Sequence, residues 1–328
     1  MKDIMGFAKH ISDNESNYLL KKTPLLFLVF NRLETTIHVF EAIRKAKPKR
    51  LYIASDGPRA HIQGDQQKVN EVRNFVCSRI DWPCEVKKLF RNVNVGCGPN
   101  VKQSIDWFFQ CEGEGIILED DVVPTPSFFP FCEETLDKYR TDERVGMISG
   151  NNHYGVVPNS DSYFFAKSRG CWGWATWQRA WIRMDYEMKW ISSQYRRSIL
   201  ANMGYSDKSI SVWENNIASI LSGKVSSWDW QWYMSMAAQN QLCIIPAYNQ
   251  VANIGFGDNA THTFGAVPDI YVQTKLLDFP LKHPTVVVPN EQFDFLYEQA
   301  RIPKSRNSLK SFIYRSIRIM AKYVLRKR

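Results

Sequence analysis

Short apolar runs alternate with amphipathic segments along the first 150 residues. Apolar runs bounded by polar or turn residues are typical of buried strands, and apolar positions three or four residues apart are typical of helices. These patterns predict strands at 25–30, 50–58, 84–90, 115–120 and 145–150, and helices at 34–47, 64–80, 100–111 and 127–141. Such alternation indicates an α/β fold with a mainly parallel central sheet and helices on both faces.

Polar side chains follow three of the predicted strands. Arg32 comes after the first strand, Asp56 after the second, and the consecutive acids Glu119, Asp120 and Asp121 after the fourth. Ligands of parallel sheets bind where the carboxyl ends of the strands meet. We therefore expect these side chains to line one edge of the sheet.

The acid triplet is the main chemical signal. Carboxylate oxygens suit hard divalent ions such as Mg²⁺ or Mn²⁺, which substrate phosphates also help to hold. Side chains alternate along an extended chain, so Glu119 and Asp121 are expected on one side and Asp120 on the other. A solvated turn is the alternative that the triplet alone leaves open.

Four segments together resemble the glycosyltransferases of the GT-A fold. They are LFLVFNR (26–32), LYIASDGP (51–58), RNVNVGCGPN (91–100) and GIILEDDVVPTPSFFPF (115–131). They are similar to the family of the inverting N-acetylglucosaminyltransferase that starts complex N-glycan branches, and to bacterial polysaccharide glycosyltransferases. The likeness runs from about residue 23 to residue 265.

The resemblance implies a UDP-sugar donor and a Mn²⁺ or Mg²⁺ cofactor. Arg32 would contact the nucleotide, as its charge complements phosphate. Asp56 would accept a hydrogen bond from the uracil ring nitrogen. Asp120 would approach the ribose or donor sugar, Glu119 would support it, and Asp121 would bind the metal.

A catalytic base is expected further along the chain. Inverting transfer requires a group that deprotonates the acceptor hydroxyl. In the resembled family that base is an aspartate in a stretch flanked by tryptophans, and SSWDWQWYMSM (226–236) carries Asp229. The alternative is that Asp229 caps the helix that begins there.

Two later segments supply further candidates. Trp172, Gly173 and Trp174 lie in RGCWGWATWQRAW (169–181), where glycine permits close backbone approach and indoles can stack on sugars. The resemblance implies a place near the donor and acceptor, and core packing is the alternative. His262, in the glycine-rich NIGFGDNATHT (253–263), is predicted to contact the metal or the diphosphate.

The net charge of +9 comes from the C-terminal end. Residues 301–328 hold ten of the 42 Lys and Arg and no acid, so the rest of the chain has 32 basic residues against 33 acidic ones. A helical wheel of 308–328 separates apolar from basic residues, which is typical of a helix in an anionic membrane interface. Docking on the protein's own core is the alternative. A nucleic-acid partner would favour a basic folded domain, so none is expected.

Cysteine content and hydropathy indicate the compartment. The seven Cys residues include no CxxC pair, which favours reduced thiols in the cytosol. The N-terminal residues lack the apolar core of a signal peptide, and no run reaches the roughly 18 apolar residues of a membrane span. We expect a cytoplasmic protein, peripheral on the inner face of the plasma membrane.

The predicted organisation has four parts. They are an N-terminal extension (1–22), a GT-A domain (23–265), a C-terminal extension (266–303) and a membrane-associating helix (304–328). The predicted reaction is metal-dependent, inverting transfer from a UDP-sugar, UDP-GlcNAc or UDP-Gal among the candidates. The acceptor would be a hydroxyl of a carbohydrate or polyprenyl-diphosphate-linked oligosaccharide, in bacterial surface polysaccharide synthesis.

Three other functions compete with this prediction. A nucleotidyl- or phosphotransferase would use the same fold and the same acids. A non-catalytic sugar-nucleotide-binding protein would keep the pocket without the reaction. A glycosidase would need two acids that face one cleft without a nucleotide pocket.

Overall fold

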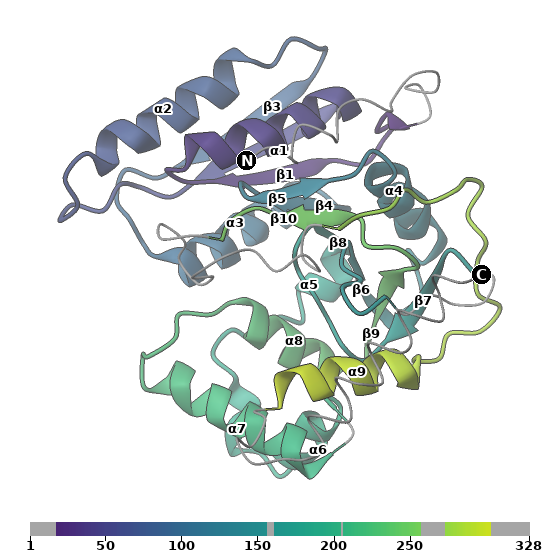
Figure 1. Cartoon of the computed structure of the whole chain (residues 1–328). Helices are drawn as coiled ribbons and strands as arrows, with labels where there is room; N and C mark the ends of the chain where they lie inside the picture. Colours follow the sequence, from purple (N-terminus) through teal and green to yellow (C-terminus); the bar gives the residue numbers. More distant parts are fainter. Residues whose placement is uncertain (1–17, 156–160, 205, 257–272, 303–328) are drawn as a thin grey trace, which may run out of the picture.

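An eight-stranded sheet forms the centre of the molecule (Figure 1). The computed structural model describes residues 18–155, 161–204, 206–256 and 273–302. His262 and the predicted helix 304–328 lie outside the described residues. The strands of the main sheet, in spatial order, are β3 (Glu85–Phe90), β2 (Arg50–Ser55), β1 (Leu25–Val29), β4 (Glu114–Glu119), β8 (Trp174–Trp177), β6 (Val145–Ser149), β9 (Leu242–Pro246) and β7 (Tyr163–Ala166).

Most strands of this sheet run in one direction. The pairs β1–β2, β2–β3, β1–β4 and β6–β9 are parallel. Only β8 and β7 run against their neighbours in the main sheet as described. The carboxyl ends of β1, β2, β4, β6 and β9 therefore meet at one edge. This confirms the predicted α/β fold class, a Rossmann-like mixed sheet.

Helices cover both faces of the sheet (Figure 1). Apolar residues of α1, α2 and α4 join one core cluster, and those of α3, α7, α8 and α9 join the other. The helix bounds are α1 Leu33–Ala46, α2 Asp65–Ser78, α3 Cys97–Cys111, α4 Phe128–Lys138, α5 Gln178–Trp181, α6 Arg196–Ala201, α7 Asp207–Leu221, α8 Asp229–Ala238 and α9 Glu291–Arg301. A 3₁₀ helix spans Lys189–Ser192.

The apolar runs read from the sequence are strands buried on both faces. Every residue of β1 is buried. Leu25, Phe27 and Val29 point into one core cluster, and Leu26 and Leu28 into the other. Side chains of a strand alternate between faces, so a continuous apolar run is what two covered faces require.

The described residues between 161 and 246 contain several regular elements. They form β7, β8, α5 to α8 and β9. Strand β8 inserts antiparallel between β4 and β6, and it carries the fully buried indoles of Trp174 and Trp177. Trp181 and Trp232 pack against Trp174 in the same cluster. Most of the tryptophan density in this region is therefore core.

The described part of the predicted C-terminal extension packs on the same sheet. Leu277 and Leu281 join one core cluster and Phe293 the other. Asn290 caps α9, since its side chain accepts a hydrogen bond from the N–H of Phe293 at 3.0 Å. In the described part of the chain, no helix has the length and apolarity needed to cross a membrane.

Candidate functional site

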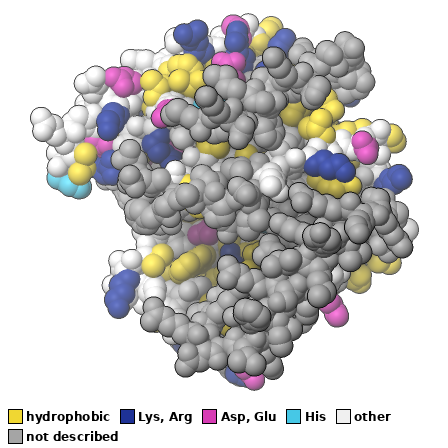
Figure 2. Space-filling view, in the orientation of Figure 1, with side chains coloured by type: hydrophobic (Ala, Val, Ile, Leu, Met, Phe, Trp, Pro, Cys, Tyr) yellow, Lys and Arg dark blue, Asp and Glu magenta, His cyan; other side chains and the backbone are white. Residues whose placement is uncertain are grey.

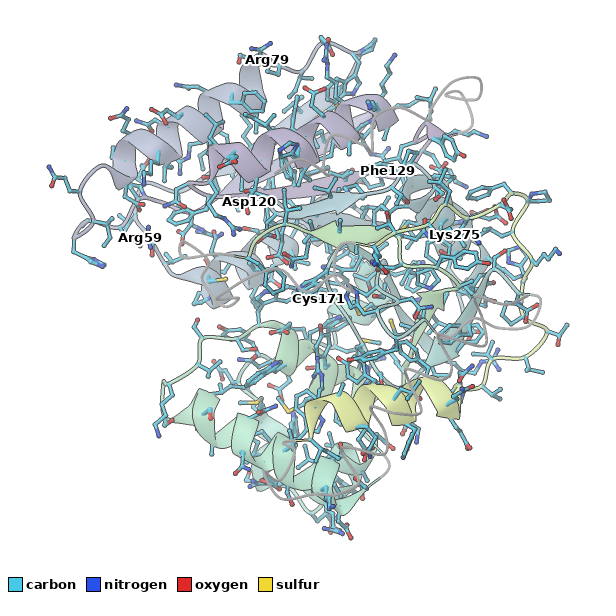
Figure 3. All side chains as sticks on the ribbon, viewed as in Figure 1. Arg59, Arg79, Asp120, Phe129, Cys171 and Lys275 are labelled. Carbon is cyan, nitrogen blue, oxygen red and sulfur yellow. The ribbon has the colours of Figure 1, made fainter. Side chains whose placement is uncertain are left out.

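Three carboxylates and one arginine lie together where β1 and β4 end. Arg32 follows β1, and Glu119, Asp120 and Asp121 come at the end of β4, its parallel neighbour. The Arg32 guanidinium forms ion pairs with Asp120 and, at 2.8 Å, with Asp121. The backbone N–H of Phe30 also donates to Asp120, at 3.3 Å. Figure 3 labels Asp120 at this position beside β1.

Asp120 and Asp121 occupy a turn. Strict alternation would point Asp120 away from Asp121, yet both carboxylates reach the same guanidinium. The expectation of alternation was wrong here because the extended strand ends at Glu119. Past the turn, β5 (Val122–Pro124) pairs with β10 (Val251–Asn253), and the N–H of Ile254 donates to the Asp121 carbonyl at 2.8 Å.

Gly255 packs directly on Asp121. A Cβ at position 255 would lie 2.0 Å from Oδ2 of Asp121, so this placement of the carboxylate requires a glycine. The N–H of Gly255 donates to the side chain of Asn253 at 2.8 Å, which fixes the glycine beside β10. The β5–β10 ladder thus brings residues from a distant part of the sequence onto the acid triplet.

The cluster carries more negative charge than Arg32 neutralises. Burial, then the charges of Asp121 and Asp120, raises the pKa of Glu119, while Arg32 opposes the rise. Burial also raises the pKa of Asp120 against the effect of Arg32. For Arg32, burial opposes the charge, but the two aspartates outweigh it and hold its pKa above the ordinary value. A site with this excess of negative charge favours a bound cation.

The acids fit a metal site that a substrate completes. Among the residues that the structure describes, no three Asp, Glu, His or Cys side chains form a complete metal-binding group. Mg²⁺ commonly binds one or two carboxylates, with phosphates and water as the other ligands. Asp121, whose side chain is 15% exposed, and its neighbour Asp120 match that partial ligand set.

The Asp56 carboxylate fixes the loop after β3. Its Oδ1 accepts from the N–H groups of Gly57 at 2.8 Å and Val95 at 3.0 Å, and its Oδ2 accepts from Gly96 at 3.1 Å. Gly57 lies against the backbone of Val93. A Cβ at position 57 would lie 2.3 Å from the Val93 carbonyl carbon. Asp56 is buried, and it shapes the edge of the site through these contacts. Its bond to a nucleobase stays a prediction.

Asp229 is the first residue of α8 and is half-buried. The Ser227 hydroxyl donates to Oδ1 of Asp229 at 2.8 Å and accepts from the N–H of Trp230 at 3.1 Å. The N-cap residue of α8 is Trp228, and Asp229 is the residue after it. Burial is the main cause of the raised pKa of Glu119, and the negative charge of Asp229 adds to it. Asp229 thus lies within electrostatic reach of the acid triplet.

Trp228 anchors Asp229 from the core side. Its indole stacks on Trp174, with ring centroids 5.7 Å apart and planes inclined by 26°. Trp174 is fully buried, so its ring faces other core side chains. Trp174 is therefore a core residue, as in the alternative considered for this stretch.

Trp172 and Gly173 lie closer to the edge of the sheet. Trp172 is half-buried, and its ring contacts His153 and Phe256 edge-on, at 5.2 and 6.2 Å between centroids. Gly173 has a φ of +56°, and a Cβ there would lie 2.7 Å from the side chain of Val251. Gly173 thus allows β10 to pack closely, and Trp172 is the member of this stretch beside the segment that covers Asp121.

Cys97 is a site residue that the sequence analysis did not single out. It is the exposed first residue of α3. Neighbouring groups partly desolvate its thiol, which raises the pKa of Cys97, and the charges of Glu119 and Asp229 act in the same direction. The next residue, Gly98, would place a Cβ 3.0 Å from the carbonyl of Ser227. The first turn of α3 therefore lies between the acid triplet and Asp229. No local signal marks it, because its neighbours are distant in sequence.

The space-filling view shows acidic atoms recessed between the part of the molecule with α3 and the part with α8 (Figure 2). The groups that meet there come from the ends of β1 and β4 and from the starts of α3 and α8. They combine one cation, three clustered carboxylates and a separate carboxylate. Such a set can bind a metal-associated phosphate and move a proton at a second position.

Comparisons with known proteins give only weak similarities. No protein-family model matches the chain, and no curated protein sequence matches it. Similar solved structures include a cytidylyltransferase from Leptospira borgpetersenii (9% identity, TM-score 0.30) and HddC from Yersinia pseudotuberculosis (8%, 0.27). Mouse xyloside xylosyltransferase 1, in its apo form, gives 9% identity and a TM-score of 0.35.

These alignments are partial. They cover 50%, 44% and 67% of this chain, in the same order, and 63%, 59% and 84% of the other proteins. The chain thus spans less than two thirds of the first two structures. Similarities at this level identify neither a family nor an activity, so function has to be argued from the site.

Proposed function

We propose that this protein transfers a sugar from a nucleotide-sugar donor to a hydroxyl group of a saccharide. The observation that carries the proposal is the Arg32–acid cluster together with the first turn of α3, which packs against Ser227, the residue that holds Asp229. A binding site for a diphosphate then lies beside a carboxylate that can serve as a base. The more specific proposal is inverting transfer from a UDP-sugar.

The donor would bind at the carboxyl edge of β1, β2 and β4. Arg32 is the cation of this edge that would contact the diphosphate, since guanidinium groups bind phosphate through paired N–H donors. The loop after β3, which the Asp56 carboxylate fixes, would border the nucleoside. Mn²⁺ or Mg²⁺, when bound by Asp121 and Asp120, would neutralise the charge that develops on the departing nucleoside diphosphate.

Asp229 would accept the proton of the acceptor hydroxyl. Ser227 holds one of its carboxylate oxygens and leaves the other for the acceptor. Trp228, stacked in the core, fixes the backbone that presents this carboxylate. Proton removal on the face opposite the leaving group would give inversion at the sugar carbon.

The acceptor and location belong to the same proposal. A polyprenyl-diphosphate-linked oligosaccharide at the inner face of the membrane would suit the basic sequence of residues 304–328. Such an acceptor would place the reaction in the assembly of a surface polysaccharide.

Purified protein should be screened with UDP-, GDP- and dTDP-sugars, with and without Mn²⁺, for donor binding and for metal-dependent hydrolysis. We expect a UDP-sugar to bind. Asp121→Asn should abolish donor binding, whereas Asp229→Asn should retain it and lose transfer. Asp207→Asn is the matched control, because Asp207 is also the first residue of a helix, α7, but its side chain is 87% exposed. NMR of the product should show the inverted anomer.

The rival functions give different results in the same screen. A nucleotidyltransferase would release pyrophosphate from a nucleoside triphosphate and a sugar 1-phosphate. A non-catalytic protein would bind the UDP-sugar without hydrolysis or transfer. Absence of any nucleotide-sugar binding with Mn²⁺ or Mg²⁺ present would refute the proposal.

A further inference from the structure

A second cation lies at the C-terminal end of α9. Arg301 is the last residue of α9, and its side chain is exposed. Its guanidinium carbon lies 4.3 Å from the ring centroid of Tyr297 and 5.7 Å from that of Trp213. Stacking of this kind holds a guanidinium in place while its N–H groups stay available at the edges.

Arg301 forms no ion pair with any residue in the described ranges. The nearest acids of its own helix are bound elsewhere. Asp294 accepts hydrogen bonds from the N–H groups of Lys167 and Ser168, at 2.9 and 2.7 Å. Glu298, three residues before Arg301, accepts from the hydroxyl of Ser206. Arg301 is therefore a positioned cation without a carboxylate partner in this part of the structure.

Aromatic contacts connect Arg301 with the start of α8. Trp213 of α7, beneath Arg301, meets Trp230 edge-on, at 6.3 Å between centroids and 88° between planes. Trp230 is the residue after Asp229. The surrounding side chains partly desolvate the guanidinium, which lowers the pKa of Arg301, but Tyr297 and Asp229 are among the groups that raise it to a net increase. Arg301 and Asp229 thus lie within electrostatic reach of each other.

The wall around Arg301 is aromatic and fixed. The Tyr297 hydroxyl donates to the carbonyl of Arg169 at 2.5 Å, which sets the orientation of its ring. Tyr154, which follows β6 at the carboxyl edge of the sheet, meets Tyr297 at 5.7 Å between centroids. Helix α9 packs against α7, and Figure 1 shows it away from β1 and α1. Asp229 is therefore linked to two groups of opposite character. Its charge acts on Glu119 of the acid triplet, and the next residue, Trp230, contacts the aromatic side chains around Arg301.

We propose that Arg301 binds an anionic group of the acceptor, a phosphate or a carboxylate attached to the saccharide whose hydroxyl Asp229 deprotonates. This inference rests on the proposed function, because it assigns the acceptor side of the same site. The guanidinium would form paired hydrogen bonds with the anion, and the aromatic wall would contact the sugar rings. Neutral saccharides would lack the charged contact.

The test compares Arg301→Gln with the wild type on three acceptors. They are N-acetylglucosamine 1-phosphate, methyl glucuronide and methyl glucoside, which carry a phosphate, a carboxylate and no charge. Arg79→Gln is the matched control. Arg79 is also an exposed arginine at a helix end, 5.9 Å from the ring of Phe75, and Figure 3 places it on α2, far from α9.

We expect Arg301→Gln to raise KM for at least one anionic acceptor about tenfold or more, the loss of a charge-assisted hydrogen bond. KM for methyl glucoside, donor hydrolysis without acceptor and all values of the Arg79 variant should stay within about twofold of the wild type. The anion that shows the larger effect identifies the group recognised. Equal losses for charged and neutral acceptors, or unchanged values for all three, would overturn the inference.

Equilibrium binding separates this inference from the proposed function. Titration calorimetry with the same three saccharides needs neither donor nor turnover. If the wild type binds an anionic saccharide and Arg301→Gln does not, the anion site stands even if no nucleotide sugar is used. If both proteins bind it equally, the anion site is refuted even if sugar transfer is confirmed.

Discussion

Replacement of Gly255 by alanine tests how the acid triplet is held. In the structure a Cβ at this position would lie 2.0 Å from Oδ2, 2.6 Å from Cγ and 2.9 Å from Cβ of Asp121. Ordinary contact begins at 3.4 Å, so Oδ2 would have to move by at least 1.4 Å. Rotation of the carboxylate alone does not suffice, because the Cβ of Asp121 is also too close. The turn or the β5–β10 ladder must shift as well.

The cost should fall mainly on activity. A displacement of about 1 Å at a reacting group can lower a rate about 100-fold. Insertion of one methyl group into a packed site costs about 1–3 kcal/mol of unfolding free energy. We therefore expect Gly255→Ala to fold and to lose about 100-fold in Mn²⁺-dependent hydrolysis of the UDP-sugar.

Gly113→Ala is the control for this experiment. Gly113 lies between α3 and β4, and a Cβ at this position would have nothing within 4 Å of it. Both variants should be compared by urea denaturation and by hydrolysis rate under one set of conditions. Gly255→Ala activity within about twofold of Gly113→Ala, with both folded, would refute the claim that this glycine sets the position of Asp121.

Three further predictions use other contacts. Asp65 accepts hydrogen bonds from Arg59, and these lower the pKa of Asp65 to about 2, although partial burial acts in the opposite direction. This stabilisation should be present above the ordinary pKa and lost as pH falls through about 2. The stability difference between wild type and Asp65→Asn in urea, about 1 kcal/mol at pH 7 since the Arg59 side chain is 40% exposed, should shrink below pH 4. Trp174→Ala should cost about 3–5 kcal/mol of unfolding free energy, and Trp172→Ala less than half of that, both measured by urea denaturation. Asp229→Asn should leave the Kd of the UDP-sugar within about twofold while transfer falls at least about 100-fold, in calorimetric and rate measurements.

The first half of the fold follows from local sequence. The predicted strands and helices up to residue 150 occur within a few residues of their expected bounds, because each apolar run feeds a strand covered on both faces. One difference of three residues is at α3, which begins at Cys97 instead of residue 100. Gly96 has a φ of +88°, and Pro99 is tolerated in the first turn of a helix, so the helix starts before its apolar positions.

The second half depends on long-range pairing. The antiparallel insertion of β8 between β4 and β6 is set by contacts between residues far apart in the chain, such as Ile117 with Trp174. The site shares this dependence. Arg32 and the acid triplet could be placed together from strand order, whereas Gly255 reaches Asp121 through β10, whose position no local pattern reveals.

The stacking of Trp228 on Trp174 has a consequence for divergence among related proteins. The two tryptophans on either side of Asp229 have separate tasks: Trp228 holds the carboxylate from the core, and Trp230 faces Trp213 and the aromatic wall. Under the proposed function, a change of acceptor would therefore alter the outer wall while the inner pair stays constant. Among homologues, we expect positions 174 and 228 to vary little and position 301 to vary with the charge of the acceptor.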